Sequence, residues 1–542
     1  MPRLLHLLRS AALLALAGLL VLPVLAVFSA WWPGTPGGAE AGAILREMAA
    51  TVLPRYAGTT LWLALWVGLG AAVVGTATAA AVTLFDFRGR RTLEWMLLLP
   101  LAMPAYVTAY AYTDFLQFSG PLQVGLRTHF GLEGRLLPEV RSLGGAVWVF
   151  IFSLYPYVYL LARTALSERA PQLMEAARLL GAPLPRRIRA VALPLARPAV
   201  AAGVALVLME TLADFGVASY FGIQTFTTGI YKAWLAMDNR WAAAQLATML
   251  LLLVVVLLQL EHRAQRRMRF ATQGVGRASS AEAQPLRLRG CWGVLALVLC
   301  ALPVLMGFVA PVAFMLRPLA ADWSVLPWDR FVEWAWHSVR LGAITAALAV
   351  GVALALAFAV RRRPDALTRG VVQLASLGYA VPGAVIVVGL LLPVGWLQAA
   401  LPHWGLAALV TSTAVGIVWA YLVRFAAVAL QSVQSGYARI PRSLDDSARM
   451  LGMGPGALLA RVHWPLLRRS TAAAALLVFV DVMKELPATM VLRPFNSDTL
   501  AVVAYQLARD ERLGEAALPS LALVAVGLVP VILLSRTLRS RA

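Results

Sequence analysis

Long apolar stretches dominate this chain and decide the solvent in which it folds. Of its 542 residues, 60% are hydrophobic and only 13% are charged, far from the balance of a soluble domain. A membrane-spanning helix needs roughly 20 apolar residues, and twelve such stretches can be read along the chain. None alternates with period two as barrel strands do. The sequence therefore predicts an all-α integral membrane protein.

The twelve stretches form two sets of six, and clusters of arginine follow every second stretch. Such clusters mark cytoplasmic loops, so we expect both termini in the cytoplasm. The net charge of +21 is then spread over short loops, which argues against a nucleic-acid-binding face. The stretches are 11–30, 59–85, 95–116, 144–162, 198–222, 241–260, 291–316, 338–360, 371–396, 405–423, 471–492 and 517–535.

The first apolar stretch allows two interpretations. Arg3 and Arg9 precede it, as basic residues precede the apolar core of a cleaved signal peptide. It is long for such a core, however, and its retention gives each half of the chain six helices. We therefore expect it to be retained as a membrane helix.

A polar loop occurs twice, and its two copies lie half a chain length apart. The first copy reads EAARLLG at 175–181, and the second reads DSARMLG at 446–452, an offset of 271 positions. Pro194 and Pro465 follow the two glycines at the same distance. A self-similarity of this kind predicts an internal duplication.

The duplication gives the expected domain organisation. We expect a first half at 1–260 with its loop at 163–197, and a second half at 291–542 with its loop at 424–470. Residues 261–290 are polar and basic, and we expect them to form a cytoplasmic linker.

Each loop reads as a helix, a glycine break and a second short helix. Gly181 and Gly452 suit a left-handed helix cap, and Pro194 and Pro465 are expected to end the second helix at the membrane. A helix resting on lipid is the alternative. Lipid does not require the same glycine and proline in both copies, so we favour docking into a groove of another protein.

The loop residues resemble the signature loop of ABC importer permeases. The first copy fits closely, and the second departs through aspartate, serine and leucine, which suggests that the two contacts are not equivalent. The resemblance assigns ATPase coupling to Glu175, Ala176, Ala177, Gly181, Ile188 and Pro194 in the first loop and to Asp446, Ser447, Ala448, Gly452, Leu459 and Pro465 in the second.

This resemblance implies a type I ABC importer permease fold, with two pseudo-symmetric six-helix halves in a bacterial inner membrane. It also implies two copies of a separate ATPase, which bind ATP and magnesium, and a periplasmic substrate-binding protein. The chain itself is then no enzyme and holds no cofactor. Its two lysines, Lys232 and Lys484, do not follow glycine as the lysine of a phosphate-binding loop does.

Two segments, 210–234 and 481–521, resemble the ferric-iron subgroup of these permeases, which shares the fused two-half form. The resemblance implies ferric iron as cargo, moved by alternating access. Another small cation, such as thiamine or a polyamine, remains open. So does a secondary transporter driven by an ion gradient, since such proteins also have repeats and intramembrane acids. The histidines are scattered, and no metal site is assigned.

Acidic residues in the predicted spans repeat with the same offset. Glu210 and Asp214 in the fifth span correspond to Asp481 and Glu485 in the eleventh. A spacing of four residues would place each pair on one helix face, at a cost of about 2.5–3.5 kcal/mol per acid in a membrane. The acids could line a cation pathway, pair with Lys484 and nearby arginines, or lie at the outer interface.

Overall fold

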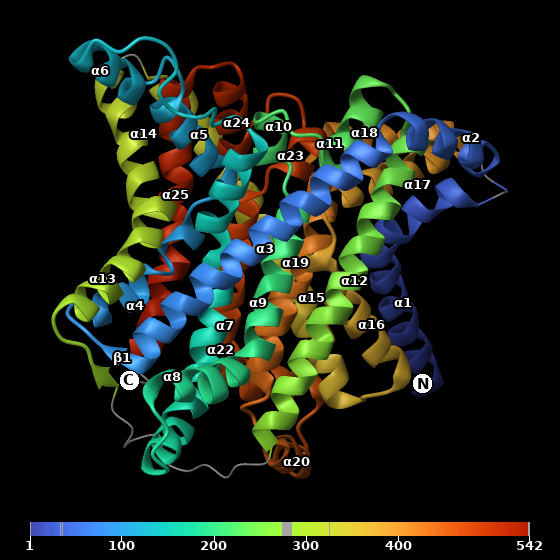
Figure 1. Cartoon of the computed structure of the whole chain (residues 1–542). Helices are drawn as coiled ribbons and strands as arrows, with labels where there is room; N and C mark the ends of the chain where they lie inside the picture. The colour runs from blue at the N-terminus through green and yellow to red at the C-terminus, as the bar shows by residue number, and fades with distance from the viewer. Residues whose placement is uncertain (1, 33, 35, 274–284, 325, 540–542) are drawn as a thin grey trace. The chain divides into compact units, whose positions relative to one another are not determined.

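The structure, a computed structural model, describes residues 2–539 except 33, 35, 274–284 and 325, and it is almost entirely helical (Figure 1). Within those residues, ten helices are long and apolar enough to cross a membrane. The number is eleven if Arg90–Ala102 and Ala105–Phe130, which meet at 92°, count as one broken span. The described strands are β1 (Phe85–Asp86) and β2 (Leu286–Arg287), a parallel pair. The prediction of an all-α membrane protein is confirmed.

The predicted number of twelve spans is not reproduced. The stretch 95–116 is divided by the bend of 92° between two helices. The stretch 471–492 falls on α22 (Trp464–Lys484) and the break that follows it. This helix is not among the apolar spans in the described part of the chain, because it carries Arg468, Arg469, Asp481 and Lys484.

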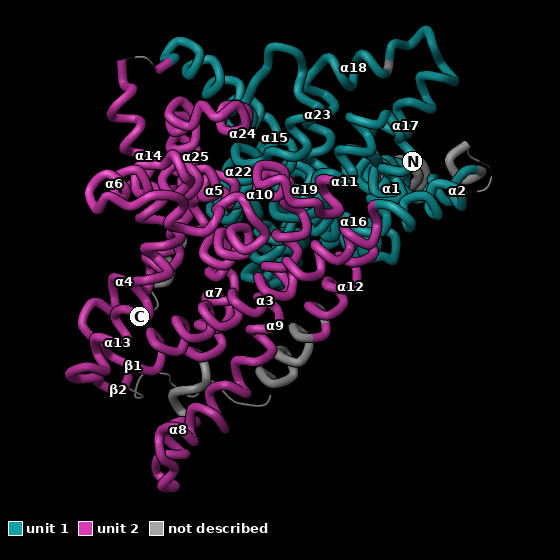
Figure 2. The backbone as a smooth tube through the Cα atoms, turned by 45° about the horizontal axis from the view of Figure 1, so that its top comes forward, with its two compact units in different colours: residues 1–51, 229–251, 327–503 teal, residues 52–228, 252–326, 504–542 magenta. Residues whose placement is uncertain are grey.

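The helices pack into two compact units, and each unit takes segments from both sequence halves (Figure 2). The units therefore do not follow the expected boundaries at 1–260 and 291–542. The expected linker begins as a continuation of α12 (Arg240–Gln273), and its residues 274–284 lie outside the described part. Unit 1 comprises 1–51, 229–251 and 327–503, and unit 2 comprises 52–228, 252–326 and 504–542.

Three long helices form the centre of unit 2. They are α3 (Leu53–Leu84), α7 (Leu143–Leu179) and α9 (Leu193–Ala213), which pack along one another. Glycines permit the close approach: a Cβ atom on Gly75 would lie 2.7 Å from Cβ of Val158, and one on Gly203 would lie 2.7 Å from its Cα. Small residues thus set the distance between these helices.

The centre of unit 1 repeats this arrangement. Here α15 (Trp328–Arg362) and α19 (Ala414–Tyr437) pack with α22. The first residues of α7 and α19 are 271 positions apart, and α9 and α22 correspond along their whole length with the same offset. The repeat that the loops indicate therefore extends into the helices.

Each unit also contains the first helix of the other sequence half. In unit 1, α1 (Pro2–Ala26) packs on α17 (Gly383–Ala400), where a Cβ atom on Gly389 would lie 1.6 Å from the carbonyl oxygen of Pro23. Trp419 Nε1 donates to the carbonyl of Leu19 at 2.7 Å. In unit 2, α14 (Ala310–Ala321) packs on α5 (Ala105–Leu116) and α25 (Leu513–Arg539).

Shorter elements complete the fold. In unit 1 they are η1 (Val27–Trp31), α2 (Pro36–Thr51), η4 (Lys232–Ala236), α16 (Ala366–Leu377), η6 (Gly378–Ala380), η7 (Pro402–Trp404), α18 (Leu406–Ser412), α20 (Arg442–Met450), α21 (Pro455–Ala457), η8 (Leu458–His463) and α23 (Pro487–Leu492). In unit 2 they are α4 (Arg90–Met96), η2 (Leu99–Ala102), α6 (Pro121–Phe130), α8 (Leu184–Arg187), η3 (Ile188–Ala192), α10 (Gly216–Tyr220), α13 (Cys291–Val304) and η5 (Leu305–Val309). The unit boundaries cross α11 (Phe226–Tyr231), α12 and α24 (Leu500–Arg509).

Candidate functional site

Both repeated loops end their first helix with the same glycine cap. Gly181 has a φ of +79°, its amide donates to the carbonyl of Arg178 at 2.9 Å, and Ala182 donates to Ala177 at 3.0 Å. This pair of bonds is a Schellman motif, which satisfies carbonyls at the end of a helix.

The second loop has the same bonds 271 positions later. Gly452 has a φ of +77°, its amide donates to Arg449 at 2.9 Å, and Met453 donates to Ala448 at 3.0 Å. The predicted sequence of helix, glycine break and helix is confirmed in both copies.

The signature residues before the glycines lie on the last turns of α7 and on α20. Glu175 pairs with Arg178 at 3.5 Å, and Asp446 pairs with Arg449 at 3.3 Å, in equivalent positions. The small residues differ in exposure: Ala176, Ser447 and both acids are exposed, Ala177 is half-buried and Ala448 is buried. Exposed pairs of this kind contribute little stability, so these side chains are available to a partner.

Two consecutive apolar residues before each glycine project into solvent. Leu179 and Leu180 are 81% and 88% exposed, and Met450 and Leu451 are 89% and 78% exposed. We call these pairs the loop tips. From the sequence, Leu180 and Leu451 were assigned only to the apolar face of each loop helix, and the exposed pairs were not recognised, although two large apolar residues end a polar helix in both copies. Such a repeated apolar tip marks an interaction surface.

The second part of each loop differs from the prediction. Pro194 and Pro465 do not end a helix, because each is the second residue of a long helix, α9 or α22. A π-helical turn precedes each of them, and Ile188 and Leu459 lie half-buried in these turns. A π turn holds an extra residue, which accommodates a proline that cannot donate to the preceding turn.

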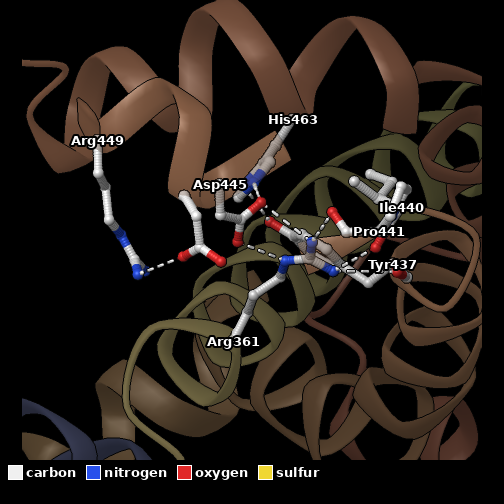
Figure 3. Close-up of polar contacts among 8 residues, drawn as sticks. Arg361, Tyr437, Ile440, Pro441, Asp445, Arg449 and His463 are labelled. Atoms are coloured by element: carbon white, nitrogen blue, oxygen red, sulfur yellow. Dashed lines mark hydrogen bonds and ion pairs between the residues drawn. The ribbon is translucent and has the colours of Figure 1, made fainter. Parts of the chain in front are cut away.

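The second loop is held by a buried polar network that sequence reasoning missed (Figure 3). Arg361 at the end of α15 donates to both carboxylate oxygens of Asp445 on α20, at 2.7 and 3.0 Å. His463 Nε2 lies 3.0 Å from Oδ1 of Asp445, and its Nδ1 lies 3.2 Å from the hydroxyl of Tyr437. The His463 side chain is fully buried.

This network stabilises the ionised form of Asp445. Burial alone would raise the pKa of this carboxyl, but hydrogen bonds from Arg361 and His463 outweigh that effect and lower the pKa below its ordinary value of 3.8. The carboxylate is therefore charged throughout the physiological range. No short sequence pattern connects Arg361 with Asp445, which lies 84 positions further along.

The predicted acidic pairs do not form two continuous helical stripes. Helix α9 ends at Ala213 and α22 ends at Lys484, so Asp214 and Glu485 lie in extended backbone beyond the helices. Glu210 and Asp481 remain on the helices and are half-buried. The prediction that the two acids of each pair share one helix face is therefore wrong, because the helix ends between them.

Asp214 and Glu485 instead lie two residues before the next short helices, α10 and α23. Asp214 accepts a hydrogen bond from the amide of Val217 at 2.8 Å, and Glu485 accepts bonds from the amides of Ala488 and Thr489, each at 3.0 Å. These are capping contacts. Helix capping was not among the roles that the sequence suggested for these acids.

Glu485 also pairs with an arginine. Its Oε1 lies 3.4 Å from Nη1 of Arg424, and both side chains are largely buried. Lys484, the partner considered in the sequence, interacts electrostatically with Asp481. Across the described residues, no three His, Cys, Asp or Glu side chains gather as metal ligands.

Comparison with known proteins shows what this chain is similar to. Residues 71–270 match the model of the binding-protein-dependent transport system inner membrane component. The chain is 24% identical to an Fe(3+)-transport system permease protein of Haemophilus influenzae, over 91% of this chain and 92% of that protein. It is 23% identical to a ferric transport system permease protein of Actinobacillus pleuropneumoniae, over 91% and 72%.

A shorter match reaches a permease with a different cargo in its name. The chain is 32% identical to a probable molybdenum ABC transporter permease of Haloferax volcanii, over 27% of this chain and 51% of that protein. The family model, the long matches and the glycine-capped loops agree with one another. Residues 71–270 match the inner membrane component of binding-protein-dependent transport systems, a non-catalytic permease, and the chain is similar along most of its length to permeases of ABC transporters.

Proposed function

We propose that this permease imports ferric iron, which a periplasmic binding protein delivers and which alternating access releases into the cytoplasm. The match to the family model implies a binding protein and an ATPase as partners, with ATP handled by the ATPase. The length of the similarity supports iron as the cargo. The ferric permeases match along 91% of this chain, whereas the molybdenum permease matches along 27%.

The two loop tips carry the mechanical part of the proposal. Each tip presents two exposed apolar side chains on a helix that ends at a rigid glycine cap. Burial of such side chains in a partner's groove would contribute about 1.5–3 kcal/mol each. We assign one ATPase subunit to each tip, so that closure of two ATPases moves both loops and switches the transport path. The remaining signature residues would surround the tip contact.

The loops are assigned to the cytoplasmic side. In unit 1, the start of α1 and α20 lie at one end, the lower end in Figure 1, and α18 and α23 lie at the other. Arginines gather in this loop, at Arg439, Arg442, Arg449 and Arg461, as the positive-inside rule expects of a cytoplasmic segment. The N-terminus would then be cytoplasmic, and we propose the same for the C-terminus from the arginines at 536–541.

The acids that remain on helices are our candidates for the cargo path. Glu210 on α9 and Asp481 on α22 occupy equivalent positions, 271 residues apart. Carboxylate oxygens suit a hard cation such as ferric iron. Asp214 and Glu485 would shape the path indirectly, through the helix breaks that they cap.

Uptake by the reconstituted transporter tests this function. The chain, its ATPase and its binding protein are placed in proteoliposomes whose ion gradients are collapsed, and radiolabelled ferric iron, molybdate or sulfate is supplied. We expect ATP-dependent accumulation of iron alone. Accumulation of an oxyanion in place of iron would overturn the cargo assignment, and uptake that needs an ion gradient but no ATP would overturn the mechanism.

A further inference from the structure

The two loop helices are joined to their membrane helices in different ways. In the first half, α7 runs unbroken from Leu143 to Leu179, so the loop helix is the end of the membrane helix itself. In the second half, the corresponding stretch is divided into α19 and α20, with Pro441 in extended backbone between them. A continuous helix transmits displacement along its own hydrogen bonds, whereas an interrupted one needs another connection.

Arg361 spans this interruption. Its guanidinium donates to the carbonyls of Tyr437 at 3.2 Å, Ile440 at 2.9 Å and Pro441 at 3.0 Å, besides the two bonds to Asp445. All five N–H donors of an arginine are thereby used. One side chain from α15 therefore holds the end of α19, the connecting segment and α20 together.

Asp445 and His463 extend this connection to the next helix. Asp445 accepts from Arg361 and faces His463 in η8, which leads directly into α22. His463 is in turn fixed by Tyr437, whose hydroxyl lies 3.2 Å from Nδ1. The loop helix α20 is thus tied to all three central helices of unit 1, namely α15, α19 and α22.

At the positions equivalent to Asp445, His463 and Tyr437, the first half has residues that cannot form the same network. The positions 271 residues earlier than Asp445, His463 and Tyr437 are Met174, Ala192 and Leu166. The counterpart of Arg361 is Arg90, which donates through Nε to the carbonyl of Val82 at 2.7 Å. The network therefore accompanies the helix interruption of the second half, and its residues do not recur at the equivalent positions of the first half.

We propose that Arg361, Asp445 and His463 are positioning residues that form the joint through which the second loop transmits movement to the membrane helices. In the first half, the loop helix and the membrane helix belong to one helix, α7. This inference rests on the proposed role of the loops. It also gives a physical basis for two loops that act together but are not equivalent.

The chemistry of the joint makes it specific to arginine. A lysine has three donors on a single nitrogen and cannot span two carboxylate oxygens and three carbonyls. Arg361→Lys keeps the charge but loses the bridging geometry. The adjacent Arg362 is exposed and lies over the ring of Phe358 at 5.8 Å, so Arg362→Lys is the matched control.

Distance measurements test the joint directly. Spin labels are attached to the exposed positions Arg363 and Ser443, in full-length protein in which Cys291 and Cys300 are replaced. We expect a narrow distribution of distances in the parent and in R362K, and a broad one in R361K. His463→Gln is the second variant, because it replaces the ring that connects η8 to Asp445 and to Tyr437 and keeps the charged pair of Arg361 and Asp445. A distribution that stays narrow in both R361K and H463Q would overturn the joint.

Coupling is measured on the same variants with the ATPase and binding protein present. The ATP hydrolysed per ion imported should rise roughly three- to tenfold in R361K and H463Q, in the range of coupling changes caused by residues between sites, and should not change in R362K. If a variant has a broad distribution of spin-label distances but hydrolyses the same amount of ATP per ion imported, the proposed role of the joint in transmitting movement is overturned. The proposed function is tested separately, by measuring whether the parent chain stimulates ATP hydrolysis by the ATPase. The spin-label distances do not depend on the outcome of that measurement.

Discussion

Gly181 and Gly452 close the two loop helices with the same left-handed turn, although they lie 271 positions apart. Their φ angles are +79° and +77°, and each amide bonds to the carbonyl three residues earlier at 2.9 Å. A cap kept this closely in two diverged copies holds the loop tips at a defined angle to the helices that follow.

Valine at either glycine should uncouple the transporter. A β-branched residue in the left-handed region costs about 1–2 kcal/mol, and no neighbouring atom lies within 4 Å of a Cβ at either position, so the strain falls on the cap itself. We expect G181V and G452V to insert normally, with more ATP hydrolysed per ion imported. Gly454 has an ordinary φ and open space around it, so G454A is the control. Fully coupled transport in both valine variants would contradict the role of the caps.

Loss of the charge on Glu485 should lower the amount of folded protein. Glu485→Gln removes the negative charge that lies 3.4 Å from Nη1 of Arg424, and breaking a buried pair costs roughly 3–5 kcal/mol. The double variant R424M/E485Q removes both charges and keeps an oxygen that can cap α23, so it should regain much of the lost abundance. Membrane abundance and thermal stability are measured together with uptake. An E485Q protein of normal stability that cannot transport would instead assign Glu485 to the cargo path.

Asp481→Asn distinguishes two roles for the acids that remain on helices, namely contact with the cargo and a structural role. If Asp481 contacts cargo, the amide should abolish uptake while the protein remains abundant, because Asp481 is half-buried and the substitution conserves its volume. A parallel loss of abundance and uptake would show a structural role, through its interaction with Lys484. Glu210→Gln is the equivalent test on α9.

A larger side chain at Gly389 should detach α1 from unit 1. No Cβ fits there, because it would lie 1.6 Å from the carbonyl oxygen of Pro23. Overpacking of this kind costs typically about 1–3 kcal/mol. We expect G389V to increase the exposure of α1 to protease in detergent. Gly395 on the same helix has space for a Cβ, with only Arg240 at 3.9 Å, and G395A should leave the protease pattern unchanged.

The pH dependence of stability should report the network at Asp445. The folded-state pKa of Asp445 lies below 3.8, so the unfolded chain binds the proton more readily. The stabilisation is therefore complete above the unfolded pKa and is lost as pH falls through the lower, folded value. The difference in Tm between the parent and D445N should stay constant from about pH 7 to 5 and shrink only in the acid range below 3.8. A difference that disappears already between pH 7 and 5 would contradict this assignment.

The sequence predicted the features that depend on local patterns. Apolar length revealed most membrane helices, and the offset of 271 located both loops together with their glycine caps. The helix breaks at Asp214 and Glu485 were not predicted, because each acid was assigned to one continuous span together with the acid four residues before it. Arg361 was missed because its partner lies 84 positions away, and only the packed helices bring them together. The packing of α1 in unit 1 and of α14 in unit 2 was not predicted either, because it depends on tertiary contacts between segments that are far apart in the sequence.

Photo-cross-linking from the loop tips tests the central claim most directly. A photoreactive amino acid is placed at Leu180 or at Leu451, and at Phe495, which is 92% exposed and follows α23 at the opposite end of unit 1 from α20 (Figure 1). After illumination of the assembled transporter, we expect adducts with the ATPase from both tips and none from position 495. Absence of an ATPase adduct from both tips, in a transporter that still imports its cargo, would contradict the account.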